Sequence, residues 1–356
     1  MSWRLPPRWR ATGITASGAL ILAVLSASSL LILAICAGWT FYVARRWIRR
    51  RGVLPIAVAV LAAFYAANLY FGKGNGDGLT QRVVLPLGMA FYVLRLVHYL
   101  FEAFKGNLRA HDFGEYLAYH FLPGSLPLGP IHRFDEFLRG WRRRRFDHPA
   151  FVHAMQRILY GLVKVVVVGN YNLGLQLSPY VAHWRETSGP LGSYLADLHY
   201  WTLLYVVFSG YSDIAIGFGA LTGVTLRENF NWPFIARNIS DFWQRWHMSL
   251  SSWCRDYVYI PVLAVSRRPS LALVSSMVIL GLWHSLTLHY LLWGLYHGIG
   301  LAAHRRYRTA RGEPQTRGPV ASRVIQVATT VLTLNFVVLS FQVTDLVETW
   351  LLAGGV

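Results

Sequence analysis

The chain alternates long apolar runs with short segments rich in arginine, a pattern typical of helical membrane proteins. The first run covers residues 14 to 44. We expect one retained membrane helix there, because the run is too long for a cleaved signal peptide and lacks a clear small-residue cleavage site. Two further spans are expected at about 53 to 71 and 83 to 101, joined by the glycine-rich polar turn at 72 to 78.

The rest of the chain contains four more candidate spans. Two are expected at about 151 to 178 and 194 to 222, separated by a loop whose only basic residue is Arg185, and a last one at about 324 to 344. The run from 271 to 303 would be about 50 Å long as one straight helix, whereas a bilayer core is about 30 Å thick. We therefore expect a broken or re-entrant helix pair there, and such breaks line cavities.

The position of the basic residues predicts the orientation. Five arginines follow the first span, against three before it (Arg45, Arg46, Arg49, Arg50 and Arg51 after; Arg4, Arg8 and Arg10 before). Because the more basic flank usually stays in the cytoplasm, the N-terminus is predicted outside. The same rule places the basic segments at 102 to 150 and 305 to 323 inside.

Composition supports a membrane protein over other classes. The 356 residues are 54% hydrophobic and 14% charged, which excludes a disordered chain and argues against an ordinary soluble domain. The net charge of +18 gathers between apolar runs, so an anionic membrane surface fits better than nucleic acid. Cys36 and Cys254 cannot form a disulfide framework. With no internal repeat or linker, we predict one all-α polytopic domain spanning 1–356.

Several ionisable residues fall inside the predicted spans, where they usually face a cavity or a partner. We expect Arg157 and Lys164 to extend toward the membrane interface, and Arg95 to pair within the bundle. The remaining members of this group are His98, Asp213, His284, His289 and His297. The spacing of the histidines at 284, 289, 297 and 304 repeats no compact i,i+4 metal pair, and no nearby Asp, Glu or Cys completes a zinc set, so we expect no metal site.

Residues 225 to 261 are too rich in amides, charges and aromatic rings to face lipid. Asn238 can cap a helix that starts at Ile239 and runs toward Leu250 or beyond, with Asp241 at the third position. Asp241 and Arg245 are then one helical turn apart and form a favourable pair. His247 is expected on the opposite, aromatic stripe of this helix, beside Trp246.

His284 lies in a second Trp–His pair, between Gly281, which permits close backbone approach, and Ser285. An imidazole there can be a general base near neutral pH or a hydrogen-bonded packing residue, and both interpretations stay open on these residues alone. The sequence has no Walker-type phosphate loop and no G-x-S-x-G nucleophile elbow. We expect Cys254 to be a small buried packing residue, and a covalent acyl carrier is the alternative.

The stretch from Phe208 to Pro261 and the two Trp-containing motifs after it resemble the membrane-bound O-acyltransferase (MBOAT) family. The resemblance is to the bacterial branch that includes the alginate O-acetylation membrane protein and the D-alanyl transfer protein of teichoic acid synthesis. The matching motifs begin at Tyr211, Glu228, Asp241, Arg255, Gly281 and Leu292, with an earlier match at Gly129. This resemblance implies a ring of helices around a central funnel, with the active-site core at 208–298, in a bacterial inner membrane.

By the same resemblance, His284 is the catalytic histidine and His247 the second active-site residue. His284 would deprotonate an acceptor hydroxyl that attacks a thioester, while His247, Asn229 or Asn231 would orient the donor or stabilise the oxyanion. The other residues expected to bind substrate are Asp241, Arg245, Trp246, Ser249 and Trp283.

The resemblance leaves the donor and the acceptor open. No permanently bound cofactor is expected; the donor would be acetyl-CoA or an acyl carrier protein, and the acceptor an exported polysaccharide or a periplasmic or extracellular partner that delivers the group. Arg133, Arg139 and the arginines at 142 to 145 can dock an acidic carrier, bind coenzyme A phosphates or only set topology. D-alanyl transfer to a teichoic-acid-type polymer, a transporter or flippase with a polar path, and an inactive assembly scaffold are the alternatives.

Overall fold

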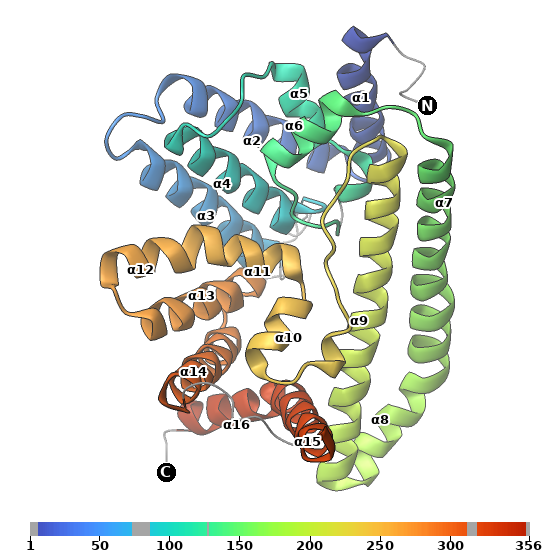
Figure 1. Ribbon diagram of the computed structural model, residues 1–356, viewed down its shortest axis with the longest axis vertical. Helices are drawn as coiled ribbons and strands as arrows, with labels where there is room; N and C mark the ends of the chain where they lie inside the picture. The colour runs from blue at the N-terminus through green and yellow to red at the C-terminus, as the bar shows by residue number, and fades with distance from the viewer. Residues whose placement is uncertain (1–5, 73–85, 127, 312–318, 354–356) are drawn as a thin grey trace. The chain divides into compact units, whose positions relative to one another are not determined.

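The computed structural model describes residues 6 to 72, 86 to 126, 128 to 311 and 319 to 353 (Figure 1). These residues form helices and loops without a strand, so the all-α prediction is confirmed. They divide into two compact units, one of 1–165 with 208–228 and one of 166–207 with 229–356. The expected single domain and funnel stay predictions.

Some expectations fall on residues outside the described ranges. Among them are the turn residues 73 to 78 and two of the arginines used for orientation, Arg4 and Arg317. The N-terminal orientation therefore stays a prediction.

The first predicted span is two helices rather than one. Helix α1 (Pro7–Leu25) ends before Ser26, whose extended backbone (φ −167°, ψ 100°) separates it from α2 (Ala27–Arg46). The Ser26 hydroxyl accepts a hydrogen bond from the Ser29 amide at 3.3 Å and so caps α2. The prediction of one helix over 14 to 44 was wrong, because a single capping residue inside an apolar run does not change its hydropathy.

Helices α3 (Val53–Gly72) and α4 (Met89–Lys105) follow, and α4 packs against both α2 and α3 (Figure 1). The span predicted at 83 to 101 corresponds to α4, whose residues 91 to 100 are all buried within the first unit. Arg95 donates to the Ser125 hydroxyl at 3.2 Å and lies over the Tyr92 ring, which confirms its expected pairing. Helix α4 is thus an interior helix of the unit.

The basic segment after α4 folds into α5 (Phe113–His120) and α6 (Phe134–Arg143). Asp112 and Glu115 form a capping box at the start of α5. Several of the arginines are paired inside this unit: Arg142 with Glu115 at 2.7 Å, Arg139 with Asp135, and Arg227 with Glu136. Arg133 is buried. Part of the basic charge is therefore used in intrachain pairs.

The next two predicted spans are longer than expected. Residues 148 to 187 are helical throughout, as α7 (His148–Leu162), a π-helical segment (Val163–Leu177) and α8 (Ser178–Thr187). Only a brief interruption at Ser188 precedes α9 (Gly189–Leu221), so the loop predicted between the spans was wrong. Polar side chains do not by themselves end a helix, and this stretch changes from α-helical to π-helical at Val163 without an interruption.

A network of ion pairs joins α7 and its π-helical extension to α9 within the first unit. Asp213 accepts from Arg157 at 2.9 Å and from Lys164 at 2.6 Å, and Arg157 also reaches Glu228 at 2.5 Å. Both basic residues are thus used in charge-assisted pairs inside the unit, and their extension toward the membrane interface stays a prediction. Asp213 belongs to the motif that begins at Tyr211.

Nearby, the backbones of α7 and α9 approach closely. A Cβ atom on Gly161 would lie 2.6 Å from the Gly210 carbonyl oxygen, which is too close for any side chain. Small residues at such contacts let membrane helices pack tightly.

The predicted break in the run from 271 to 303 is confirmed. Helix α13 (Pro269–His284) and α14 (Leu288–Arg311) are separated by three non-helical residues, Ser285 to Thr287. Added Cβ atoms on Gly281 and Gly294 would clash with the carbonyl oxygens of Tyr290, at 2.2 Å, and Met277, at 2.6 Å. Gly281 faces Tyr290, and Met277, earlier on α13, faces Gly294, later on α14. The two helices therefore run antiparallel as a tight hairpin.

The last span is also bent. Helices α15 (Pro319–Val338) and α16 (Ser340–Leu352) meet at Leu339 with an angle of 42°. Four described helices, or five if this bent pair counts as one, are long and apolar enough to cross a membrane. The remaining α-helices described in the second unit are α10 (Ile239–Arg245), α11 (Met248–Cys254) and α12 (Ile260–Ser266), with a 3-10 turn (Pro233–Ile235) before α10 and a π-helical segment (Arg255–Tyr259) between α11 and α12.

Candidate active site

The helix predicted to run from Ile239 past Leu250 is interrupted at His247. Asn238 caps α10 as expected, accepting from the Asp241 amide at 2.9 Å, but α10 ends at Arg245. His247 has a left-handed backbone (φ 43°, ψ 52°), which is uncommon for a residue with a side chain, and α11 begins one residue later. The prediction of one continuous helix was wrong.

The segment around Asn229 supplies hydrogen bonds at this interruption. The Met248 amide donates to the Asn229 carbonyl at 2.8 Å, and the Asn231 amide donates to the Arg245 carbonyl at 2.9 Å. These bonds replace the helical ones that the break removes, as buried backbone groups require. The left-handed backbone at His247 is therefore held by hydrogen bonds from the loop around Asn229 rather than by its own helix.

The Asn229 side chain fixes the imidazole of His247. Its Oδ1 atom lies 3.0 Å from Nδ1 of His247, 2.8 Å from the Ser249 hydroxyl and 3.3 Å from the Ser249 amide. A backbone amide only donates, so this atom is an acceptor, and Nδ1 of His247 must carry the hydrogen that it shares. In a neutral ring Nε2 is then the unprotonated nitrogen.

His247 is buried and lies outside the candidate membrane spans. Burial, and secondarily the nearby His284, lowers the pKa of His247 to about 3. The ring is thus neutral at physiological pH, and its Nε2 accepts rather than donates a hydrogen bond. This protonation state suits positioning of a hydroxyl better than stabilisation of an oxyanion.

His284 is the last residue of α13, where the hairpin breaks. Its ring lies against three aromatic rings, with centroids 4.7 Å from Trp283, 5.7 Å from Tyr290 and 5.8 Å from Trp293. The residue nevertheless keeps exposed surface at this break. A ring held by neighbours on several sides but still accessible is suited to meet a substrate. The Trp283 ring also lies 6.4 Å from that of His247 and so connects the two histidines.

The predicted site residues fall into two groups. His247, Asn229, Ser249, Trp283 and His284 form one continuous set of contacts. The second group centres on Arg245, which pairs with Asp241 at 2.7 Å and donates to the Asn231 carbonyl at 3.2 Å. Its contacts support the turn before His247. Trp246 is buried and stacks on Phe242, with centroids 5.6 Å apart.

Two aromatic residues were missed at the sequence level. Tyr290 stacks on His284, and Trp293 contacts His284 while its Nε1 donates to the Ser340 hydroxyl at 3.2 Å. The turn at Ser285 to Thr287 returns the chain, so residues six and nine positions after His284 come back against it. The predicted hairpin was the available signal for both.

The expectation that no acid lies near the later histidines was also wrong. Nδ1 of His289 is 2.8 Å from Asp345 Oδ1. Asp345 lies on α16, and its distance along the chain hides the contact from any spacing argument.

The family model described as MBOAT, membrane-bound O-acyltransferase family, matches residues 53–343. The chain belongs to the MBOAT family. The match includes both histidines of the candidate active site, so the resemblance drawn from the motifs is confirmed at family level.

Three relatives of the chain differ in the polymer that their names give. The chain is 32% identical over 282 residues to the probable alginate O-acetylase AlgI of Azotobacter vinelandii, covering 74% of this chain and 54% of that protein. It is 30% identical over 237 residues to the teichoic acid D-alanyltransferase of Streptococcus thermophilus, covering 63% and 57%. It is 29% identical over 264 residues to the peptidoglycan O-acetyltransferase of Helicobacter pylori, covering 65% and 49%. The chain thus spans about half the length of these relatives.

Proposed function

We propose that this protein is a membrane O-acyltransferase that transfers an acetyl or similar small acyl group to a hydroxyl, with His284 as general base. The observation that carries this proposal is the position of His284, exposed at a helix break and held by Trp283, Tyr290 and Trp293. Membership of the MBOAT family supports the reaction class. The names of the relatives support an envelope or exported polymer as acceptor.

The reaction at His284 is a direct acyl transfer. The imidazole takes the proton of the acceptor hydroxyl as its oxygen attacks the thioester carbonyl carbon. The tetrahedral intermediate then collapses, the carbon–sulfur bond breaks, and the leaving sulfur takes the proton back from the imidazolium. An ester and a free thiol are the products, and the histidine returns to its neutral form.

His247 is proposed as the positioning partner of this base. Its Nδ1–H is directed to Asn229, so Nε2 presents a lone pair that can accept from an acceptor hydroxyl and align it. This lone pair supports orientation of the acceptor hydroxyl, in place of the donor orientation or the oxyanion role expected from the sequence. Donors for the oxyanion would come from amide groups such as the side chains of Asn229 or Asn231.

We further propose a cytoplasmic thioester, acetyl-CoA or an acyl carrier protein, as donor and a bacterial inner membrane as location. The acceptor is an exported polysaccharide or cell-envelope polymer, or a periplasmic or extracellular partner that delivers the group. D-alanyl transfer is the second candidate, favoured by the similarity to a teichoic acid D-alanyltransferase.

The donor question can be tested with purified protein. Incubation with radiolabelled acetyl-CoA, and separately with D-alanyl-loaded carrier protein, should give labelled acceptor from one donor. Transfer from acetyl-CoA supports O-acetylation, and transfer from the loaded carrier supports D-alanylation. Consumption of neither donor, by protein that remains folded and monodisperse, would contradict both.

A cellular test addresses the acceptor. Replacement of His284 by alanine should remove ester-linked acyl groups from the envelope or exported polymer, while His183→Ala, which changes an exposed histidine on α8, should not. Equal membrane levels of both variants make the comparison valid. Unchanged polymer acylation in His284→Ala would contradict the assignment of the base.

A further inference from the structure

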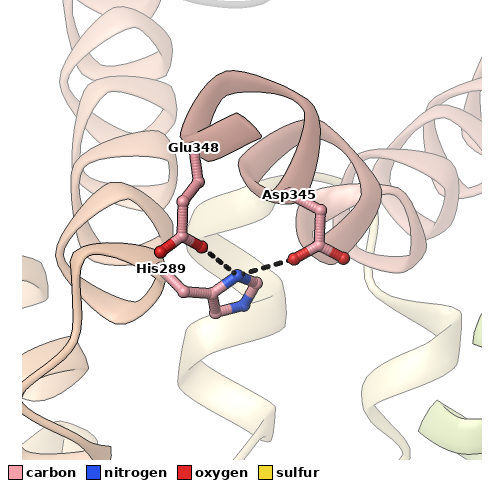
Figure 2. Close-up of side chains that lie close together, drawn as sticks. All are labelled: His289, Asp345 and Glu348. Atoms are coloured by element: carbon pink, nitrogen blue, oxygen red, sulfur yellow. Dashed lines mark ion pairs between the residues drawn. The ribbon is translucent and has the colours of Figure 1, made fainter. Parts of the chain in front are cut away.

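His289 lies beside two carboxylates that come from another helix. Its Nδ1 atom is 2.8 Å from Oδ1 of Asp345 and 3.6 Å from Oε2 of Glu348, and Figure 2 shows both acids directed at the ring. His289 is the second residue of α14, whereas the acids are three positions apart on α16 and so share one face. One ligand atom from each residue lies within 4.8 Å of the other two. The three donors therefore converge on one point.

The charge of this cluster is not balanced by a basic side chain. Within the part of the chain that the structure describes, neither Asp345 nor Glu348 pairs with lysine or arginine. Two carboxylates against one imidazole leave at least one net negative charge, whichever protonation state the ring has. The side chains of His289 and Glu348 are 19% and 25% exposed, and that of Asp345 is 61% exposed. A partly enclosed, negatively charged set of donors favours a cation.

Contacts outside the cluster hold the two helices in register. The His289 ring stacks on Phe341, with centroids 5.5 Å apart and an interplanar angle of 10°. One helical turn along α14, Trp293 stacks on the same Phe341 and donates to Ser340. Packing outside the cluster thus helps to bring the ligand atoms together, as a preorganised binding site requires.

The donor set indicates the class of metal. Tetrahedral zinc, with bonds of about 2.0 to 2.1 Å, keeps its ligand atoms about 3.3 Å apart. The separations of His289 Nδ1 from the two carboxylate oxygens, 2.8 and 3.6 Å, lie on either side of that value, and all three ligand atoms lie within 4.8 Å of one another, so side-chain rotations would close the set around an ion. An imidazole with two carboxylates suits a first-row divalent ion better than calcium or magnesium, which prefer oxygen alone. Three protein ligands leave a position for water or another oxygen ligand.

We propose that His289, Asp345 and Glu348 form a site for a first-row divalent cation, with zinc as the best match, that joins the start of α14 to α16. The bound ion would fix His289 and hence the adjacent Tyr290, which stacks on His284. Metal binding itself does not depend on the proposed acyl transfer, so the two can fail separately.

The test uses untagged full-length protein, freed of metal with a chelator in detergent and then titrated with zinc chloride. Bound zinc is measured by elemental analysis and by competition with a chromophoric chelator. We expect one zinc per chain and a higher unfolding temperature on zinc addition. Asp345→Asn and Glu348→Gln keep side-chain shape and should each bind zinc at least tenfold more weakly. His183→Ala removes an exposed histidine and should bind zinc as the unchanged protein does.

Three results would overturn the proposal. The first is no zinc bound at micromolar concentration by the unchanged protein. The second is binding unchanged in both Asp345→Asn and Glu348→Gln, which would place zinc elsewhere. The third is binding of calcium or magnesium in preference to zinc. In chelator, an unfolding temperature equal to that of the unchanged protein shows that a variant is folded. If one of the two variants does not meet this condition, the zinc affinity of the other decides.

Discussion

Nδ1 of His247 lies 3.0 Å from Oδ1 of Asn229, and this contact sets which nitrogen of the histidine faces away with a lone pair. The same amide oxygen accepts from the Ser249 hydroxyl. Asn229 therefore controls both the orientation of His247 and the backbone turn on which it lies. The roles of the two residues can be separated by substitution.

Asn229→Asp should move the pH dependence of acyl transfer. In the native protein burial lowers the pKa of His247 to about 3, so its protonation does not limit activity at mildly acidic pH. A carboxylate at position 229 favours the protonated ring and raises that pKa. The acidic limb of the rate profile should then shift to higher pH, as measured by initial rates between about pH 5 and 8. An unchanged profile with an unchanged rate would show that His247 does not act in transfer.

Asp241 should stabilise the turn before His247 in a pH-dependent way. Burial raises the pKa of Asp241, but hydrogen bonds from the Arg237 amide and the Arg245 guanidinium outweigh it, and the net pKa is lowered. A lowered carboxyl pKa adds stability above its ordinary value near 4, and this stability is lost as the pH falls through the lowered value. Asp241→Asn should therefore unfold at a lower temperature than the native protein at pH 7.

The difference between the two proteins should shrink toward zero as the pH falls below about 4. Thermal unfolding in detergent across this range measures it. A difference that is independent of pH would show that lost packing, and not lost charge, causes the effect.

Gly281→Ala should disrupt the hairpin of α13 and α14. The new methyl group would lie 2.2 Å from the Tyr290 carbonyl oxygen, so the helices must separate and the contacts of His284 must change. We expect a lower unfolding temperature and acyl transfer reduced at least tenfold. Gly38→Ala on α2 is the matched control, because nothing lies within 4 Å of its added methyl. Equal behaviour of the two variants would contradict the close approach.

Asp213→Asn should destabilise the first unit by about 1 to 2 kcal/mol, since Arg157 and Lys164 lose a shared carboxylate that is only partly screened by solvent. Lys105→Gln breaks an exposed pair with Glu102 and should change stability by less than about 0.5 kcal/mol. Denaturant or thermal unfolding compares them. A larger effect at Lys105 would contradict the importance given to the network.

Hydropathy and charge predict much of this fold but not its interruptions. The all-α class, the hairpin break near Ser285 and the cap at Asn238 follow from local patterns. The break at His247 does not, because it depends on hydrogen bonds from Asn229 and Asn231, which lie 18 and 16 positions earlier. Residues near one another in the chain predict caps, whereas distant backbone partners decide where a helix stops.

The candidate site shows the same limit. The motifs identify His284 and His247, but the aromatic enclosure of His284 by Tyr290 and Trp293 depends on the returning hairpin. The meeting of His289 with Asp345 depends on packing between α14 and α16. Arguments from residue spacing consider only neighbours along one helix. They therefore miss residues such as Asp345, which lie on another helix that packs against the first.

The central claim is that His284 is the base for acyl transfer, and single-turnover kinetics with purified protein test it most directly. The native protein and the His183→Ala control should transfer the acyl group to the acceptor at equal rates. His284→Ala, folded and binding donor as the native protein does, should be slower by at least about a hundredfold, the usual contribution of a general base. Transfer by His284→Ala at the native rate would contradict the account.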